Sequence, residues 1–369
     1  MGNLPSPVRS KFFERAGNEY LKVSVCSSQG FRAHMEDSHI VSMSLSNHPN
    51  YHLFGIFDGH NGFFIFLIFP KKKKEFFRCK QAANYLSKHI ATKINELENL
   101  TNSEYIQKCI MEMDKEFCKG EYSDHGSTLV FALIKTPGGP VAVSQKRNNC
   151  KDNAKTKVKR EEQVEEEEEE EEKKKDNNNN NNNNKKEDIA ISIDTDANAN
   201  INTNTNNDTD YEVTVYWAGD SRCVWIRENN FKELTEDHVP TLPKEKERIE
   251  KANGVVNLMT GRIDHRLAVS RAFGNGPLKD NANIPFDQQK VISLCDFCPT
   301  FKASPDDWIF LFCDGLVEAC SNEMLVQNLK ELVDRVDDPV YALSFLFDNI
   351  WDGGSKDNMS ACLIQFTGF

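Results

Sequence analysis

Short apolar segments along the chain predict β-strands. The alternating segment LKVSVCS, residues 21–27, and the apolar run HLFGIFD, residues 52–58, each end close to polar residues. Further segments of this kind are residues 127–135, 212–220, 308–313 and 359–366 and a stretch around Val224. The segments 127–135 and 212–220 look like the two strands of a hairpin with a long insertion at its tip, which loop-closure entropy tolerates.

Apolar residues at steps of three and four predict amphipathic helices between these strands. One such series is Ala83, Leu86, Ile90, Ile94 and Leu97. We expect further helices at residues 103–118, 243–252, 322–334 and 339–351. Strands that follow one another, with helices grouped around them, indicate an α+β layered fold rather than alternating β-α units.

A polar, low-complexity segment, the acidic tract (residues 146–210), interrupts this pattern. It has ten Glu between positions 161 and 172 and eight consecutive Asn from 177 to 184. Its 12 basic and 18 acidic residues supply −6 of the formal net charge of −12. Such a composition buries too little apolar surface to offset chain entropy, so we expect a disordered insertion. The remaining chain has no basic stripe with interleaved aromatics, which argues against nucleic acid as a partner.

The 11 cysteines indicate reduced thiols, because their number is odd and their spacing irregular. Cys295 and Cys298 form a CxxC, but no second Cys or His pair lies nearby at zinc-ligand spacing, so we expect two ordinary thiols. Reduced thiols favour a cytoplasmic or nuclear protein.

The N-terminal residues resemble a lipidation signal rather than a secretory one. They lack an apolar h-region, but MGNLPS has Gly2 and Ser6 where N-myristoylation requires them. A single myristoyl chain would give weak, reversible membrane association unless Arg9, Lys11 and Arg15 help. We therefore expect residues 1–20 to be an N-terminal extension that is a candidate for myristoylation.

Acidic residues recur at or near the ends of the predicted strands. They are Glu36, Asp37, Asp58, Asp220, Asp314 and Asp357. Any one of them alone could be a turn residue, but hard oxygen ligands gathered at one end of a sheet suit Mg²⁺ or Mn²⁺. Two metal ions sharing a carboxylate would activate water for attack on phosphorus. Arg32 would then clamp the phosphoryl oxygens, and His60 would protonate the departing alkoxide.

Eight motifs follow one another between about residues 21 and 366. They are GFRAHMEDSH, FGIFDGHNG, GSTLVFAL, YWAGDSRCVW, LTEDHVP, GRIDHRLAVSRAFG, FLFCDGLVEACSN and KDNMSACLI. In content and order they resemble the motifs of the metal-dependent protein phosphatases of the protein phosphatase 2C type, which are serine/threonine phosphatases. The resemblance implies a four-layer α/β/β/α sandwich, two antiparallel sheets flanked by helices, with two Mg²⁺ or Mn²⁺ ions at one end. Residues 21–369 would form one domain, interrupted at 63–79 and at about 137–210.

The same resemblance implies a ligand set for the two ions. Asp58 would bridge both ions. Glu36 and the Gly59 carbonyl would complete one site, and Asp314 and Asp357 would complete the other.

It also implies roles for the residues around the ions. Asp37 would orient metal-bound water, Arg32 would bind the substrate phosphate, and His60 would be the general acid. Asp220 resembles a residue that, with Asp314, holds a weaker third ion. We expect Asn358 to cap a loop, and Ser270 and Arg271 to be structural.

The chain departs from the family pattern at three places. Glu318 and Asn275 stand where Asp is common, and both departures bear on the third ion. The third is about seventeen extra residues, 63–79, between DGHNG and AANYL. Their continuous apolar run, seven residues at positions 63–69, falls short of the roughly twenty that span a bilayer, so no transmembrane segment is expected. We hypothesise a retained intron or mispredicted exon edge; if translated, the segment would expose apolar surface beside the site.

These observations predict a monomeric protein serine/threonine phosphatase. It would hydrolyse phosphoserine and phosphothreonine in phosphoprotein substrates through a hydroxide bridging two metal ions, without a phosphoenzyme. One alternative is a pseudophosphatase acting as a regulatory binding module, because residues 63–79 directly follow the site. Another is a membrane-tethered scaffold organised by the N-terminus and the acidic tract.

Overall fold

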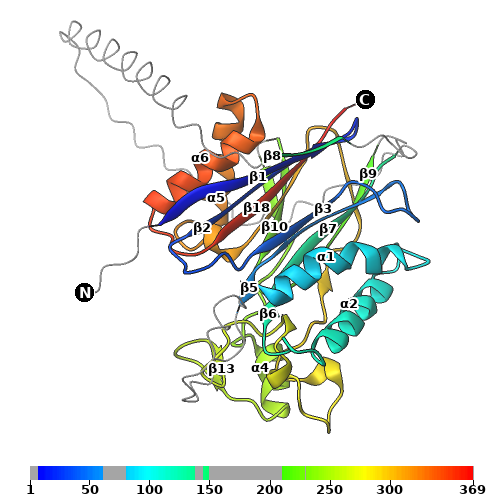
Figure 1. The fold of residues 1–369 in the computed structure, drawn as a ribbon, viewed down its shortest axis with the longest axis vertical. Helices are drawn as coiled ribbons and strands as arrows, with labels where there is room; N and C mark the ends of the chain where they lie inside the picture. Colours follow the sequence, from blue (N-terminus) through cyan, green and yellow to red (C-terminus); the bar gives the residue numbers. More distant parts are fainter. Residues whose placement is uncertain (1–6, 61–79, 138–143, 149–209, 229, 369) are drawn as a thin grey trace, which may run out of the picture. The chain divides into compact units, whose positions relative to one another are not determined.

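Two antiparallel sheets form the centre of the structure, a computed structural model that describes residues 7–60, 80–137, 144–148, 210–228 and 230–368 (Figure 1). The described residues all belong to one compact unit, and a second unit, Asn149–Thr205, lies outside them. The seven-stranded sheet has the order β11-β10-β17-β18-β2-β1-β8. Its strands are β1 (Val8–Gly17), β2 (Leu21–Gly30), β8 (Ser144–Asn148), β10 (Arg222–Arg227), β11 (Asn230–Glu233), β17 (Trp308–Phe312) and β18 (Met359–Phe366).

The second large sheet has the order β15-β9-β7-β4-β3, and β16 also pairs with β9. Its strands are β3 (Ser38–Ser42), β4 (Tyr51–Phe57), β7 (Leu129–Lys135), β9 (Tyr211–Ala218), β15 (Asp296–Phe297) and β16 (Phe301–Ala303). Alternate residues of its strands face opposite sides. In β4, Phe54 and Ile56 join the core shared with the other sheet, whereas Leu53 and Phe57 pack against helices. Burial on both faces explains why these strands are continuous apolar runs.

Helices cover the outer face of each large sheet (Figure 1). α1 (Gln81–Asn95) and α2 (Ser103–Phe117) bury Ile90 and Ile110 against the sheet that contains β4. α5 (Asn322–Arg335) and α6 (Pro339–Asp352) bury Leu329 and Phe347 in the core of the other sheet. The predicted α/β/β/α sandwich is confirmed, and none of the helices within the described ranges is long and apolar enough to cross a membrane.

The predicted hairpin is confirmed only as a pair of neighbouring strands. β7 and β9 are antiparallel, with Leu129 opposite Ala218. However, the chain between them contributes β8, which pairs with β1 in the other sheet. The spacing of apolar residues does not indicate this crossing, because β8 lies at the edge of a polar segment. Most of the acidic tract lies outside the described residues, as do Gly2 and residues 63–79.

Strand β1 is part of the expected N-terminal extension, yet it pairs with β2 and β8 in the sheet. Its basic side chains contact α6: the ion pairs are Arg9–Asp352 at 3.4 Å, Lys11–Asp348 at 2.7 Å and Arg15–Asp338 at 2.7 Å. Each of these three cations therefore has a carboxylate partner, in α6 for Arg9 and Lys11 and in the residue before α6 for Arg15.

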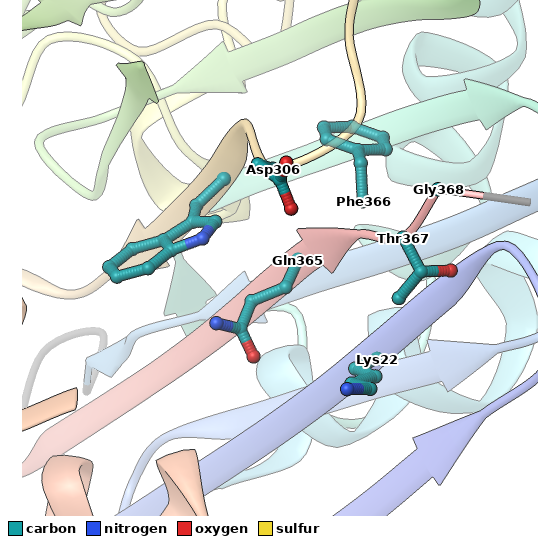
Figure 2. Close-up of a pocket in the computed structure, with 7 residues that line it drawn as sticks. Lys22, Asp306, Gln365, Phe366, Thr367 and Gly368 are labelled. Atoms are coloured by element: carbon teal, nitrogen blue, oxygen red, sulfur yellow. The ribbon is translucent and has the colours of Figure 1, made fainter. Parts of the chain in front are cut away.

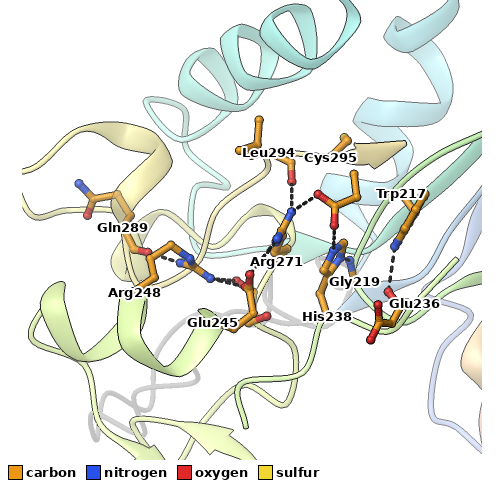
Figure 3. A network of polar contacts seen from close by, with 12 residues as sticks. Trp217, Gly219, Glu236, His238, Glu245, Arg248, Arg271, Gln289, Leu294 and Cys295 are labelled. Carbon is orange, nitrogen blue, oxygen red and sulfur yellow. Dashed lines mark hydrogen bonds and ion pairs between the residues drawn. The ribbon is translucent and has the colours of Figure 1, made fainter. Parts of the chain in front are cut away.

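A polar network holds the segment between β11 and β15 against the end of β9 (Figure 3). Arg271 pairs with Glu245 at 2.8 Å and with Asp296 at 2.7 Å. Asp296 lies 3.0 Å from Nε2 of His238, whose Nδ1 accepts a hydrogen bond from the Gly219 amide. Arg271 is therefore structural, as predicted. This segment also contains α4 (Pro243–Lys251), β12 (Val256–Asn257), β13 (Arg262–Ile263), β14 (Phe273–Gly274) and the 3-10 helices η2 (Gly276–Leu278) and η3 (Phe286–Gln288).

Candidate metal centre

The strand register brings the candidate carboxylates to one end of both sheets. β18 begins at Met359, opposite Ser28 near the end of β2, and β17 runs antiparallel to β18. The loop after β2, which carries residues 31–37, therefore meets Asp314 after β17 and Asp357 before β18. In the other sheet, β4 ends opposite the start of β3 and β9 ends opposite the start of β7, which adds Asp58 and Asp220.

Asp37 lies at the centre of this cluster. Its residue is 1 % exposed, and neither carboxylate oxygen has a hydrogen-bond partner among the described residues. Potential ligand atoms of Asp37, Asp58 and Cys313 all lie within 4.8 Å of one another. Burial raises the pKa of Asp37 to about 7; the charges of Asp357 and Asp314 add to this rise, and the nearby polar groups of Ser360 and Cys313, which make no hydrogen bond of good geometry to it, only partly oppose it.

The pKa values of the neighbouring carboxylates are also raised by burial and by repulsion between their charges. Burial raises the pKa of Asp58 well above its usual range, with further repulsion from Asp37 and Asp314. Burial, with repulsion from Asp314, raises the pKa of Asp220 to about 8. The pKa of Asp314 is raised by burial and by Asp357, and its Oδ1 has no partner within the described part of the chain. Buried, mutually repelling oxygen donors of this kind fit a divalent cation such as Mg²⁺ or Mn²⁺.

The loop that follows β2 is held in place by Asn358. Its Oδ1 accepts a hydrogen bond from the Glu36 amide at 2.8 Å, and its Nδ2 donates to the carbonyls of Gln29 and His34 at 2.7 and 3.0 Å. Asn358 therefore caps the loop, as predicted.

Gly59 completes the contact between the first and second motifs. A Cβ at this position would collide with the carbonyl oxygen of Glu36 and approach Ala83. Only glycine allows the two backbones to lie this close, so the Gly59 peptide remains beside Glu36.

His60 belongs to a small three-stranded sheet, β14-β6-β5, in which β5 is Gly59–His60 and β6 is Gly126–Ser127. Nε2 of His60 lies 2.9 Å from Oδ1 of Asn275. Burial lowers the pKa of His60 to about 4, and the hydrogen bond to Asn275 opposes this shift because it favours the protonated ring. The family pattern connects position 275 with a third metal ion, whereas in the structure the side-chain amide of Asn275 contacts the candidate general acid.

Glu318, the other departure from the family pattern, also has a partner that the sequence did not indicate. Its Oε2 accepts hydrogen bonds from the Ser355 hydroxyl at 3.1 Å and the Lys356 amide at 2.8 Å. Glu318 thus holds the turn that precedes Asp357.

Cys313 also belongs to the cluster, although no motif in the sequence pointed to it. Its thiol donates to the Asn358 carbonyl at 3.5 Å and accepts from the Ser360 amide at 3.2 Å. Burial raises its pKa well above the usual range, so it remains a protonated, structural thiol. Cys295 and Cys298 are also free thiols, as expected.

A surface pocket at the opposite ends of β2 and β18 is separate from this cluster (Figure 2). It is lined by Lys22, Asp306, Trp308, Gln365, Phe366, Thr367 and Gly368. At roughly 3.3 Å per residue, the length of β18 separates it from Asp357 by about 26 Å. None of the candidate residues lines this pocket.

Known proteins resemble the chain in both sequence and fold. A family model described as "Protein phosphatase 2C" matches residues 21–142 and 141–359. "Probable protein phosphatase 2C 11" of Oryza sativa subsp. japonica is 25% identical over 98% of this chain and 90% of its own length. "Protein phosphatase 1B" of Homo sapiens is 36% identical over 41% of this chain and 31% of its own length. A solved structure of a phosphatase from a pathogenic strain of Toxoplasma gondii has a TM-score of 0.69 at 23% identity, covering 97% of this chain and 96% of its own.

Proposed function

The chain belongs to the protein phosphatase 2C family, and from that premise we propose that it is a metal-dependent protein serine/threonine phosphatase. It hydrolyses phosphoserine and phosphothreonine in phosphoprotein substrates. The observation that carries this proposal is Asp37, a buried carboxylate without a hydrogen-bond partner in the described residues, packed against Asp58. A buried, unpaired carboxylate cluster is costly unless a cation compensates it.

Two ions, Mg²⁺ or Mn²⁺, are the proposed cofactors. Asp58 would be shared by both ions, Glu36 and the Gly59 carbonyl would hold one ion, and Asp314 and Asp357 would hold the other. When bound, the ions would neutralise the carboxylates and lower the pKa of water for attack on phosphorus. We assign Asp220, whose pKa responds to Asp314, to a weaker third site.

The chain's own side chains orient the reaction. The side chain of Arg32 is 47% exposed, so its guanidinium can bind the phosphoryl oxygens. Asp37 accepts a hydrogen bond from the attacking water and orients it. His60 donates a proton to the departing serine or threonine oxygen.

Other properties follow from the sequence and are part of the proposal. The enzyme acts as a monomer in the cytoplasm or nucleus, and myristoylation of Gly2 would add weak membrane association. The comparisons do not support the pseudophosphatase alternative. That alternative was based on residues 63–79, which lie outside the described residues. The candidate carboxylates, in contrast, lie together.

A phosphatase assay on the full chain tests the proposed function. We expect phosphate release from phosphoserine and phosphothreonine peptides with Mg²⁺ or Mn²⁺, and loss of activity in EDTA. Asp314→Asn should abolish turnover. Folded wild-type protein that releases no phosphate above the Asp314→Asn level with either metal would overturn the proposal.

A further inference from the structure

The small sheet β14-β6-β5 brings Asn275 to His60 across a single glycine. Gly126 of β6 is paired with His60 of β5 and, on its other side, with Gly274 of β14. Asn275 follows Gly274 directly, and its Oδ1 lies 2.9 Å from Nε2 of His60. A Cβ at Gly126 would collide with both the Asn275 amide and the His60 ring. The lack of a side chain at Gly126 is therefore what permits this contact.

The backbone that carries Asn275 is held in an unusual conformation. Gly274 has φ 78° and Asn275 has φ 56°, in the left-handed region that glycine and asparagine tolerate best. The backbone N–H of Asn275 donates to the His125 carbonyl at 2.7 Å. The backbone carbonyl of Asn275 accepts a hydrogen bond from the Leu278 N–H at 2.8 Å. The turn thus aims the Asn275 side chain in one direction.

A buried ion pair between Asp114 and Lys279 also holds this turn. Oδ1 of Asp114, on α2, accepts a hydrogen bond from the Gly274 amide at 2.6 Å. Its other oxygen binds Lys279, and both side chains are 0% exposed. Lys279 also donates to the Ala272 carbonyl at 2.7 Å. This buried pair therefore fixes the backbone on both sides of Asn275, at Gly274 and at Lys279.

We propose that Asn275 is a positioning residue for the phosphatase reaction. Its amide oxygen accepts the Nε2 hydrogen of His60, so that Nδ1 carries the proton that is transferred to the departing oxygen. The inference rests on the proposed function, in which His60 is the general acid.

The proton and electrons balance in this step. As water attacks phosphorus, the bond from phosphorus to the serine or threonine oxygen breaks and its electron pair stays on that oxygen. The acid form of His60 is the imidazolium, with a second proton, taken up from water, on Nδ1; this proton moves to the oxygen, which leaves as the alcohol. His60 becomes a neutral imidazole that still donates its Nε2 hydrogen to Asn275. An amide oxygen accepts this hydrogen before and after the transfer and adds no charge of its own.

A comparison of two leaving groups tests the inference. The serine or threonine oxygen needs a proton to leave, whereas the weakly basic phenolate of p-nitrophenyl phosphate needs little help. Asn275→Gly removes only the amide, because glycine adopts φ 56° without strain. We expect it to lower kcat on a phosphothreonine peptide by about 10-fold or more and on p-nitrophenyl phosphate by less than about 2-fold.

Two further variants complete the experiment. Asn275→Asp retains an acceptor oxygen and should recover most of the kcat on the peptide. The matched control is Asn283→Gly, at an exposed asparagine on the same segment, which should leave both substrates unaffected. If Asn275→Gly does not fold, Asn275→Ala is tested for the same leaving-group difference.

The outcomes separate the inference from the proposed function. Equal losses on both substrates in a folded Asn275 variant would overturn the positioning role while leaving the phosphatase assignment intact. An Asn275→Asp variant as impaired on the peptide as Asn275→Gly would overturn it as well. Wild-type protein that turns over neither substrate would refute the proposed function and the inference together.

Discussion

Nε of Arg32 lies 3.0 Å from Oδ1 of Asp357, so the residue proposed to bind phosphate contacts a proposed metal ligand. Its Nη2 also lies 3.6 Å from Glu36, a proposed ligand of the other ion. One guanidinium therefore borders carboxylates assigned to both ions. We therefore expect changes at Arg32 to weaken mainly substrate binding. Changes at the carboxylates should weaken mainly metal binding.

Replacing Arg32 with lysine should weaken phosphate binding. Lysine keeps the charge but loses the planar fork that makes two hydrogen bonds to a phosphoryl group. Loss of one charged hydrogen bond, about 1.5–3 kcal/mol, predicts a rise of about 10-fold or more in KM or an equivalent fall in kcat/KM. Steady-state kinetics on a phosphopeptide checks this. Arg9→Lys, at an exposed position, is the control; unchanged kcat/KM in Arg32→Lys would contradict the role of Arg32.

Metal ions should stabilise the folded protein through Asp314. Mg²⁺ or Mn²⁺ should raise the melting temperature of the wild type, and EDTA should reverse the rise, because the ions relieve repulsion among buried carboxylates. Asn at position 314 removes one charge from the cluster. Asp314→Asn should therefore melt higher than the wild type without metal, yet respond less to added metal.

The matched control for this experiment is Asp306→Asn, in the separate pocket. Asp306 has φ 71°, a conformation that asparagine also tolerates. It should keep the full metal response. A melting curve of Asp314→Asn that shifts with metal as much as that of the wild type would show that Asp314 is not a ligand.

Acid should destabilise the protein through Glu245 and Asp296. Burial opposes ionisation of Glu245, but Arg271 and Arg248 outweigh it and lower the pKa to about 2. In Asp296, His238 and Arg271 likewise outweigh burial, and the pKa is about 2.

The folded-state pKa of each group lies below its unfolded value of about 4, so the ionised form stabilises the fold. This stability is present above about pH 4 and is lost as the pH falls toward about 2. Urea denaturation between these pH values should show a shallower decline for Glu245→Gln than for the wild type. Glu250→Gln, in the exposed helical pair with Lys246, should decline like the wild type. Parallel curves for Glu245→Gln and the wild type would count against this assignment.

Breaking the buried pair of Asp114 and Lys279 should cost far more than breaking a surface pair. Lys279→Met leaves a buried carboxylate without its cation, and such changes lower the free energy of unfolding by about 3–5 kcal/mol. Lys251→Met removes one partner of the exposed pair Lys251–Glu247 and should have no measurable effect. Urea denaturation of both variants at neutral pH makes the comparison. A loss below about 1 kcal/mol in Lys279→Met would mean that the site relaxes or admits water.

Local periodicity predicted most of the long strands and helices. The segments expected at 21–27, 52–58 and 359–366 are β2, β4 and β18, and the series that begins at Ala83 is α1. Each prediction needs only neighbouring residues, because burial on one or both faces imposes the spacing of apolar positions. Strands β1 and β8 were not predicted, because their largely polar sequences have no regular spacing of apolar positions.

The sequence by itself determined the family, the order of the elements and the carboxylates that end the strands, because these depend on motifs and local patterns. The tertiary structure alone decided that Asn275 contacts His60, that Glu318 holds the turn before Asp357, and that the cations of β1 pair with α6. Each of these contacts joins distant segments through strand register and left-handed turns. No spacing along the chain encodes them, since a shift of one residue in register would separate the same side chains.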